Sequence, residues 1–130
     1  MAEAGFLLDA SALLAYLHRE PGWQRVRQAV YQGAVVGAVN LAEALGKLAE
    51  KGVDTASLAL KLQALGIRVE PFLAEDALQA ARLRPPTRSL GLSLGDRACL
   101  ALGLRLGLPV LTADRAWAEL DLPTEIEVIR

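Results

Sequence analysis

The stretch GFLLDAS, residues 5–11, carries most of the information about the fold. Its first part, Gly5 to Leu8, is a short apolar run that predicts a buried strand, and the run ends at the acidic Asp9. Ser11 is a residue type that often caps helices, so we expect a helix over residues 12–19. The chain is thus predicted to pass from a buried strand into a helix, with an acid at the junction.

The same alternation of apolar runs and helical patterns continues to the end of the chain. Further strands are predicted at residues 34–39, 67–70, 109–112 and 126–129. Helices are predicted at residues 23–31, 41–51, 55–65, 74–83 and 93–106, with a short one around Ala116. Arg84-Pro85-Pro86 predicts an extended connection. Strands that are apolar throughout and separated by helices indicate a three-layer α/β fold around a parallel sheet.

Length and composition limit the kind of protein further. With 130 residues, 53% of them hydrophobic, the chain is expected to form one folded domain, residues 1–130. Its single cysteine cannot form an internal disulfide, which points to a reducing compartment. No signal peptide is visible, and the apolar runs are far shorter than the roughly 18 residues of a membrane span. We therefore expect a cytoplasmic protein without a membrane partner.

Four acidic residues stand where the predicted strands end or helices begin. Asp9 follows the first strand directly, Glu43 lies in the first turn of the helix after the second, and Asp114 lies just past the fourth. The carboxyl ends of parallel strands share one edge of a sheet, where ligands bind. Asp96 opens the long helix after the two prolines and joins this group only if that helix begins at the same edge.

A group of neighbouring carboxylates predicts a bound cation. Negative charges held a few ångströms apart repel, and a cation neutralises them. Mg²⁺ or Mn²⁺ fits best, because both prefer oxygen ligands, and His18 and Cys99 are the only histidine and cysteine. An acid-only metal site without a nucleophilic side chain favours phosphodiester hydrolysis by metal-activated water.

Each acid also has a purely structural interpretation. Asp9, Asp96 and Asp114 are all placed to cap helices, and Glu43 is placed to pair with Lys47 one turn later. Ser11 is the better predicted cap for the first helix, which leaves Asp9 free for function. The positions of all four acids taken together favour the metal site, because independent caps have no reason to converge.

Four motifs, in this order, resemble those of a known family. They are Leu7–Ala15 (LLDASALLA), Asn40–Glu43 (NLAE), Leu94–Ala101 (LGDRACLA) and Leu111–Asp114 (LTAD). Together they are similar to the acidic motifs of PIN domains, particularly the VapC-type toxins of bacterial and archaeal toxin–antitoxin pairs. The resemblance extends from residue 7 to the C-terminus.

The resemblance implies a fold, an activity and partners. It implies a parallel sheet with strand order 3-2-1-4-5, Mg²⁺- or Mn²⁺-dependent cleavage of RNA, and frequent homodimers. It also implies a small antitoxin whose C-terminal segment covers the acidic pocket. The implied metal ligands are Asp9, Glu43, Asp96 and Asp114, and the implied supporting polar residues are Ser11, Asn40 and Thr112. Asn40 departs from the serine or threonine often found near this position.

Three arginines flank the two prolines, namely Arg82, Arg84 and Arg88. We expect them to contact the RNA backbone, because guanidinium groups bind phosphate oxygens. The alternative is an arginine-rich loop that faces water. With 14 basic against 15 acidic residues, nucleic-acid affinity must come from such local clusters.

Other functions remain as alternatives. A haloacid-dehalogenase-like phosphatase needs a second aspartate two residues after the first, and this chain has Ser11 there. Such a phosphatase also needs a lysine after the fourth strand, and this chain has none. A phosphate-receiver domain needs paired acids on its first strand and a lysine after its last, and neither is present. A PIN scaffold that binds RNA or a partner without cutting, and a housekeeping RNA-processing nuclease, are the remaining alternatives.

Overall fold

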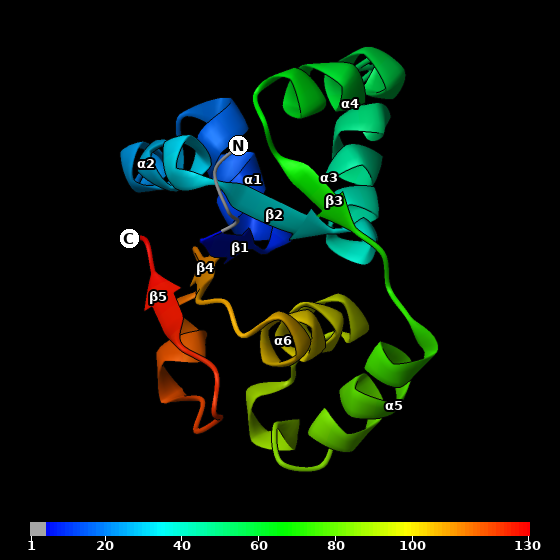
Figure 1. The fold of residues 1–130 in the computed structure, drawn as a ribbon, viewed down its shortest axis with the longest axis vertical. Helices are drawn as coiled ribbons and strands as arrows, with labels where there is room; N and C mark the ends of the chain where they lie inside the picture. The colour runs from blue at the N-terminus through cyan, green and yellow to red at the C-terminus, as the bar shows by residue number, and fades with distance from the viewer. Residues whose placement is uncertain (1–4) are drawn as a thin grey trace.

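Five short strands form an all-parallel sheet in the computed structural model, which describes residues 5–130. The strands are β1 (Phe6–Leu8), β2 (Ala34–Gly37), β3 (Arg68–Glu70), β4 (Val110–Thr112) and β5 (Ile126–Val128). Their order is β3-β2-β1-β4-β5, with β1 in the centre of the sheet (Figure 1). The predicted α/β class and strand order 3-2-1-4-5 are therefore confirmed.

Helices cover both faces of this sheet. In Figure 1 the first four helices lie on one side of the sheet and the last two on the other. The first group is α1 (Ala10–His18), α2 (Trp23–Gln32), α3 (Ala38–Glu50) and α4 (Thr55–Ala64), and the second is α5 (Ala74–Leu83) and α6 (Leu94–Leu106). Two short 3-10 helices follow α5 and β4, namely η1 (Arg88–Leu90) and η2 (Arg115–Glu119). None of the helices formed by residues 5–130 has the length and apolar character to cross a membrane.

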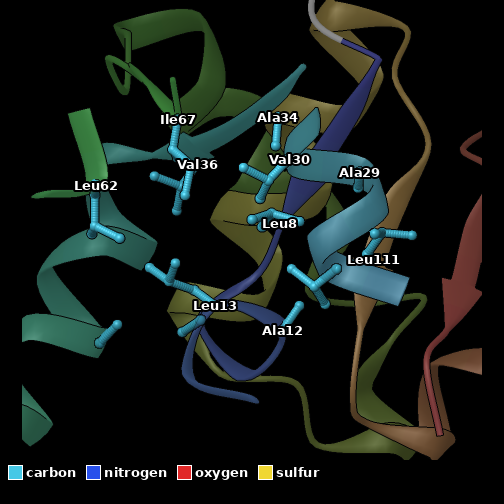
Figure 2. Packing of buried hydrophobic residues seen from close by; sticks show 13 residues of the cluster. Leu8, Ala12, Leu13, Ala29, Val30, Ala34, Val36, Leu62, Ile67 and Leu111 are labelled. Atoms are coloured by element: carbon cyan, nitrogen blue, oxygen red, sulfur yellow. The ribbon is translucent and has the colours of Figure 1, made fainter. Parts of the chain in front are cut away.

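Successive strand residues point into two separate cores, as the period of a strand requires. Leu8, Val36 and Leu111 pack against α1 to α4 in one core, part of which Figure 2 shows. Their neighbours Leu7, Val35 and Val110 pack against α5, α6 and the buried Trp117 of η2 in the other. All six strand residues are fully buried. Each contributes about 1.5–3 kcal/mol by leaving water, so the three central strands are held firmly in register.

This register brings three strand ends to the same level. Leu8 of β1 is paired with Val36 of β2 and with Leu111 of β4. One residue further on, Asp9, Gly37 and Thr112 therefore lie side by side at the carboxyl edge of the sheet. The apolar strands thus place a carboxylate and a hydroxyl next to each other.

The first helix begins earlier than predicted. α1 starts at Ala10, and Asp9 is its N-cap, because the Asp9 side chain accepts a hydrogen bond from the Ala12 N–H. The prediction that Ser11 caps this helix is therefore wrong, and Ser11 lies in the first turn. Both residue types are good caps, so composition alone does not distinguish them at a separation of two residues.

The second strand ends earlier than predicted, at Gly37 instead of Val39. Ala38 and Val39 begin α3, so Glu43 lies in the second turn of this helix and Asn40 in the first. A short apolar run has no periodicity that separates a strand from a buried helix start, which explains the error.

The double proline does not form the predicted extended connection. Arg84 keeps helical backbone angles although a proline follows it, and a turn leads into η1. Thr87 closes this turn, because its N–H and its hydroxyl both donate to the Leu83 carbonyl, at 3.3 and 2.7 Å. The steric penalty before proline is overcome here by two hydrogen bonds that complete the end of α5.

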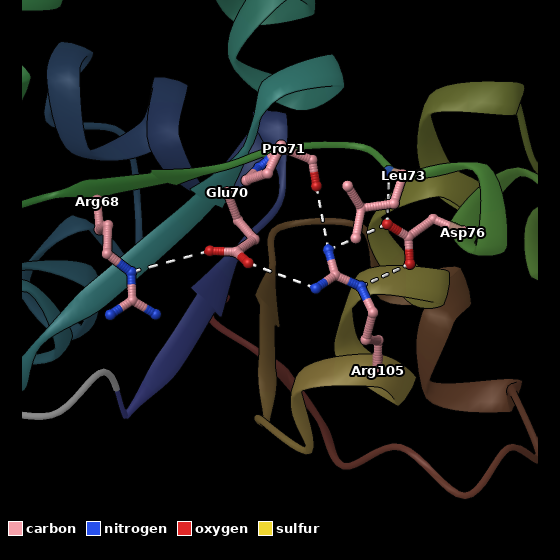
Figure 3. A network of polar contacts seen from close by, with 6 residues as sticks. All are labelled: Arg68, Glu70, Pro71, Leu73, Asp76 and Arg105. Atoms are coloured by element: carbon pink, nitrogen blue, oxygen red, sulfur yellow. Dashed lines mark hydrogen bonds and ion pairs between the residues drawn. The ribbon is translucent and has the colours of Figure 1, made fainter.

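A polar network joins the far end of α6 to the start of α5 and the end of β3 (Figure 3). Arg105 donates to both carboxylate oxygens of Asp76, at 2.8 and 3.0 Å, and also to Glu70 and the Pro71 carbonyl. Burial by itself raises the pKa of Asp76, but hydrogen bonds from Arg105 and the Leu73 N–H, with the Arg105 charge, hold that pKa below its ordinary value. Arg68 forms a looser ion pair with Glu70.

Candidate functional site

Asp9 lies buried at the carboxyl edge of the central strand, surrounded by hydrogen-bond donors. Its Oδ1 accepts bonds from the Ser11 hydroxyl and the Ala12 N–H, both at 2.7 Å. Its Oδ2 accepts one from the Thr112 hydroxyl at 2.6 Å. A carboxylate has about four acceptor positions, so one position on Oδ2 remains for a further ligand.

The surroundings of Asp9 make its negative charge unfavourable. Burial raises the pKa of its carboxyl group, the hydrogen bonds from Thr112, Ala12 and Ser11 oppose that rise, and the charge of Asp96 adds to it. A cation beside Asp9 would remove this electrostatic cost.

Ser11 and Thr112 fix the position of this carboxylate. Each hydroxyl donates its proton to Asp9 and accepts a backbone N–H from the segment after β4, from Ala113 at 2.9 Å and from Asp114 at 3.1 Å respectively. Both residues, which the family resemblance names as supporting polar groups, thus lie within hydrogen-bond distance of Asp9, and their role in a metal site stays a prediction.

Asp96 lies in the first turn of α6, where it forms a capping box with Ser93. The Ser93 hydroxyl accepts the Asp96 N–H, and Asp96 Oδ2 accepts the Ser93 N–H at 3.0 Å. The other oxygen, Oδ1, accepts no hydrogen bond within residues 5–130. The first turn of α6 lies at the same edge of the sheet, because the Gly95 carbonyl, one residue before Asp96, accepts a hydrogen bond from Asn40 in the first turn of α3, the helix that follows β2 directly.

Glu43 reaches the same region from α3. It forms no ion pair with Lys47 within residues 5–130, so the structural interpretation of Glu43 is not realised here. Instead, the buried Asn40 Nδ2 donates to Glu43 Oε1 at 2.8 Å and to the Gly95 carbonyl of α6 at 3.0 Å. Asn40 therefore connects α3 to the start of α6 and holds Glu43 between them.

Asp9, Asp96 and Glu43 all lie near enough to the buried Cys99 thiol for their charges to act on it. The pKa of Cys99 is raised well above its usual value, first by burial and then by the charges of Asp9, Asp96 and Glu43. The starts of α1 and α6 and the second turn of α3, which are far apart in the sequence, thus place these acids in one region of the structure.

Asp114 is not brought into this group. Its side chain is exposed and caps η2, because its Oδ1 accepts the Ala116 N–H at 3.0 Å. Within residues 5–130, the hydrogen bond that links it to the group comes from its backbone N–H, which donates to Thr112. Asp114 therefore caps η2, and its role as a metal ligand stays a prediction.

The structure separates the three predicted RNA-binding arginines. Arg84 and Arg88 line one pocket of ≈ 350 Å³, together with Thr87, Gly91 and Leu92. Arg82 lies in a different groove, whose lining includes the acidic Glu75 and Asp76. Neither Arg84 nor Arg88 forms an ion pair with any acidic residue among residues 5–130. The lining of this pocket includes Leu92, the residue before Ser93, which caps the helix that carries Asp96.

The donors present fit a hard divalent cation, although they do not form a closed cage. Within residues 5–130, no three acidic, histidine or cysteine side chains gather closely enough to hold an ion between them. Mg²⁺ commonly binds through only one or two carboxylates and completes its shell with water and substrate phosphate. The free positions on Asp9 Oδ2 and Asp96 Oδ1 match that mode of binding.

Sequence reasoning overlooked one residue at this site, Gly95. The only sign in the sequence is a glycine near the start of a helix, where glycine is unfavourable.

An all-parallel α/β sheet with carboxylates at the carboxyl edge of its central strands defines a class of ligand-binding proteins. Within that class, this chain belongs to the PIN domain family, whose model matches residues 6–122. A comparison with curated proteins finds no match.

Solved structures share the fold. VapBC2 from Rickettsia felis, bound to a DNA fragment from its promoter, superimposes with a TM-score of 0.75 at 12% identity, covering 95% of this chain and 97% of that one. A toxin–antitoxin complex from Klebsiella pneumoniae gives a TM-score of 0.72 at 17% identity, covering 94% and 100%. VapC20 from Mycobacterium tuberculosis, a toxin that cleaves the sarcin–ricin loop, gives 0.71 at 18% identity, covering 93% and 99%.

Proposed function

We propose that this chain is a Mg²⁺- or Mn²⁺-dependent endoribonuclease and the toxin of a toxin–antitoxin pair. The observation that carries the proposal is the buried Asp9 carboxylate, whose charge is unfavourable and is further opposed by Asp96. Membership of the PIN domain family and the fold shared with VapC20, a toxin that cleaves an RNA loop, support it.

The residues of the chain would divide the work as follows. Asp9 and Asp96 would hold the cation through the open acceptor positions on Oδ2 and Oδ1 respectively, and Glu43 would add negative charge from α3. Ser11 and Thr112 keep Asp9 ionised and in place by donating their protons to it. The bound ion supplies an activated water and neutralises charge on the attacked phosphate. Asp114 stands at the rim of the site, where it orients Thr112 through its backbone.

RNA would reach this site along the pocket of Arg84 and Arg88. Both side chains have a positive charge that no acidic residue within residues 5–130 neutralises, and phosphate contacts fix a nucleic acid in register. Arg82 is less suitable, because Glu75 and Asp76 line its groove and repel phosphate.

An antitoxin would cover an apolar groove between α3, α4 and β3. The groove has a volume of ≈ 640 Å³, and its lining includes Val36, Leu41, Leu60 and Val69. Leu60 is 67% exposed and Val69 46%, so a partner that covers them removes apolar surface from water. Its lining includes Leu41 of α3, the helix that also carries Glu43, so a segment seated there would lie against that helix.

A cleavage assay on a structured RNA tests the nuclease proposal. Wild-type protein should cleave with Mn²⁺ and not with EDTA, and Asp96→Asn should lose cleavage while it keeps its fold, because Asn retains the capping geometry but not the charge. Asp121→Asn, which changes an exposed acid outside the four motifs, is the control. RNA binding without cleavage by pure wild-type protein would instead favour a non-catalytic PIN module.

Expression in cells separates a toxin from a housekeeping nuclease. The toxin role requires growth arrest when the chain is expressed alone, and relief when a small partner protein is produced with it. Harmless overproduction of an active nuclease would favour RNA processing. The homodimer and the cytoplasmic location expected from the sequence stay predictions.

A further inference from the structure

Gly95 is buried in the first turn of α6, directly before Asp96. Glycine in a helix is less favourable than alanine, so its presence at a buried helical position calls for a reason. The reason lies in the space that a side chain would occupy. A Cβ built on Gly95 would come within 2.4 Å of Glu43 Oε1 and 2.5 Å of Glu43 Oε2. The Glu43 carboxylate therefore occupies the volume that any other residue at position 95 would fill.

Asn40 holds the same carboxylate from a second direction. Its Nδ2 donates both to Glu43 Oε1 and to the carbonyl of Gly95, at 2.8 and 3.0 Å. Asn40 is only 1% exposed, so these bonds form away from water. The Glu43 carboxylate is thus fixed between an amide of α3 and the bare Cα of α6.

We infer that Gly95 is a positioning residue: its missing side chain lets the Glu43 carboxylate lie at the start of α6, next to Asp96. A larger residue at this position pushes the flexible end of Glu43 away, while the backbone of α6 remains helical. Gly95 thereby acts on the position of the negative charge that Glu43 brings to the site. Its effect on metal binding rests on the proposed function, whereas the contact between Gly95 and Glu43 does not.

Gly46 provides a matched control for a substitution at Gly95. It also lies inside a helix, α3, but a Cβ built there meets nothing within 4 Å. Gly46→Ala and Gly95→Ala thus make the same chemical change in a helix, and only Gly95→Ala meets the carboxylate.

The first experiment measures Mn²⁺ binding by titration calorimetry. Gly95→Ala should bind Mn²⁺ at least about tenfold more weakly than wild type, the size of effect seen when groups that orient metal ligands are lost. Gly46→Ala should bind it as wild type does. Equal affinity of Gly95→Ala and wild type overturns the inference.

The second experiment needs no metal. Melting temperatures in EDTA are compared for Gly95→Ala made in the wild type and in Glu43→Ala, which removes the carboxylate. In the Glu43→Ala background, Gly95→Ala should raise the melting temperature as much as Gly46→Ala does. With Glu43 present, the rise should be smaller or reversed, because the new methyl group displaces the side chain.

The two experiments separate the inference from the proposed function. If wild-type protein neither binds Mn²⁺ nor cleaves RNA, the proposed function fails, and the melting comparison alone decides whether Gly95 positions Glu43. If Gly95→Ala raises the melting temperature equally in both backgrounds, Gly95 does not position Glu43, whatever the activity of the wild type.

Discussion

The carboxylate of Asp9 combines two roles that the sequence presents as alternatives. It caps α1 through the Ala12 N–H, and it lies buried beside Asp96 with an acceptor position free. A helix start attracts negative charge, so the cap helps to keep Asp9 ionised against the effect of burial. A capping role therefore does not exclude a role in metal binding, for Asp9 or for Asp96, whose capping box leaves Oδ1 without a hydrogen bond within residues 5–130.

The difference between Asp9 and Asp114 is testable by thermal melts. Because burial raises the pKa of Asp9, its ionised form destabilises the metal-free fold at neutral pH relative to a neutral group. Asp9→Asn should therefore melt higher than wild type in EDTA. Asp114→Asn should melt close to wild type, because Asp114 is exposed and asparagine caps as well as aspartate does.

Mn²⁺ completes this comparison. It should raise the melting temperature of wild type and of Asp114→Asn, since a ligand that binds only the native state stabilises it. Asp9→Asn should respond much less. A lower melting temperature for Asp9→Asn in EDTA, with no shift by Mn²⁺ in any of the three proteins, would rule out the site at Asp9.

At the scale of elements, the turn between α5 and α6 separates arginine side chains that are close in the sequence. Arg84 and Arg88 share one pocket, whereas Arg82 faces the groove of Glu75 and Asp76. The cause is the helical continuation through Arg84 and the closure of the turn by Thr87, which the two prolines did not predict.

This separation predicts unequal effects on RNA binding. In EDTA, Arg84→Ala and Arg88→Ala should each weaken binding of a labelled single-stranded RNA and lower the log–log salt slope by about one. Arg82→Ala should leave both the affinity and the slope unchanged. Fluorescence anisotropy at several salt concentrations measures these values, and equal losses for all three variants would show a diffuse basic surface in place of a pocket.

The sequence was sufficient to predict most helices and strands, but it was insufficient to predict where side chains point. Apolar strands that each end in a polar residue predicted the sheet and the edge at which Asp9 and Thr112 meet, because strand register follows from burial. The bond from Asn40 to the Gly95 carbonyl joins residues of two helices, and no local pattern encodes how α3 meets α6. Asp114 turns outward because η2 needs a cap, which spacing after a strand does not show.

At the scale of the whole molecule, the network around Arg105 connects elements that the acidic site does not connect. It joins α5 and the end of β3 to the last turn of α6, whereas Asp96 lies in the first turn of that helix. Asp76 is 2% exposed and Arg105 21%, so the pair is largely removed from water.

Loss of Arg105 should therefore destabilise the fold without changing the site. Arg105→Met leaves the buried Asp76 charge unpaired, and we expect a loss of about 3 kcal/mol at neutral pH. Because the pKa of Asp76 is lowered in the native wild type, the contribution of the pair is complete above the ordinary pKa of aspartate and disappears as the pH falls through the lowered value. Urea melts of both proteins at neutral and acidic pH should show the difference shrinking in acid.

The control for this prediction is the double variant Asp76→Asn, Arg105→Met, which removes both charges. It should be more stable at neutral pH than Arg105→Met alone, because no buried charge is left unpaired. A stability difference between wild type and Arg105→Met that does not depend on pH would assign the loss to packing of the arginine stem.

The ion pair of Arg68 with Glu70 has a consequence for how the protein behaves when concentrated. Both residues belong to β3, a strand of three residues at one edge of the sheet, and β5, equally short, has Glu127 at the other. An open edge invites strands from neighbouring molecules, and charged residues on short strands discourage such pairing. Self-association of this chain should therefore take place between helical surfaces and preserve the native sheet, and it should not progress to fibrils.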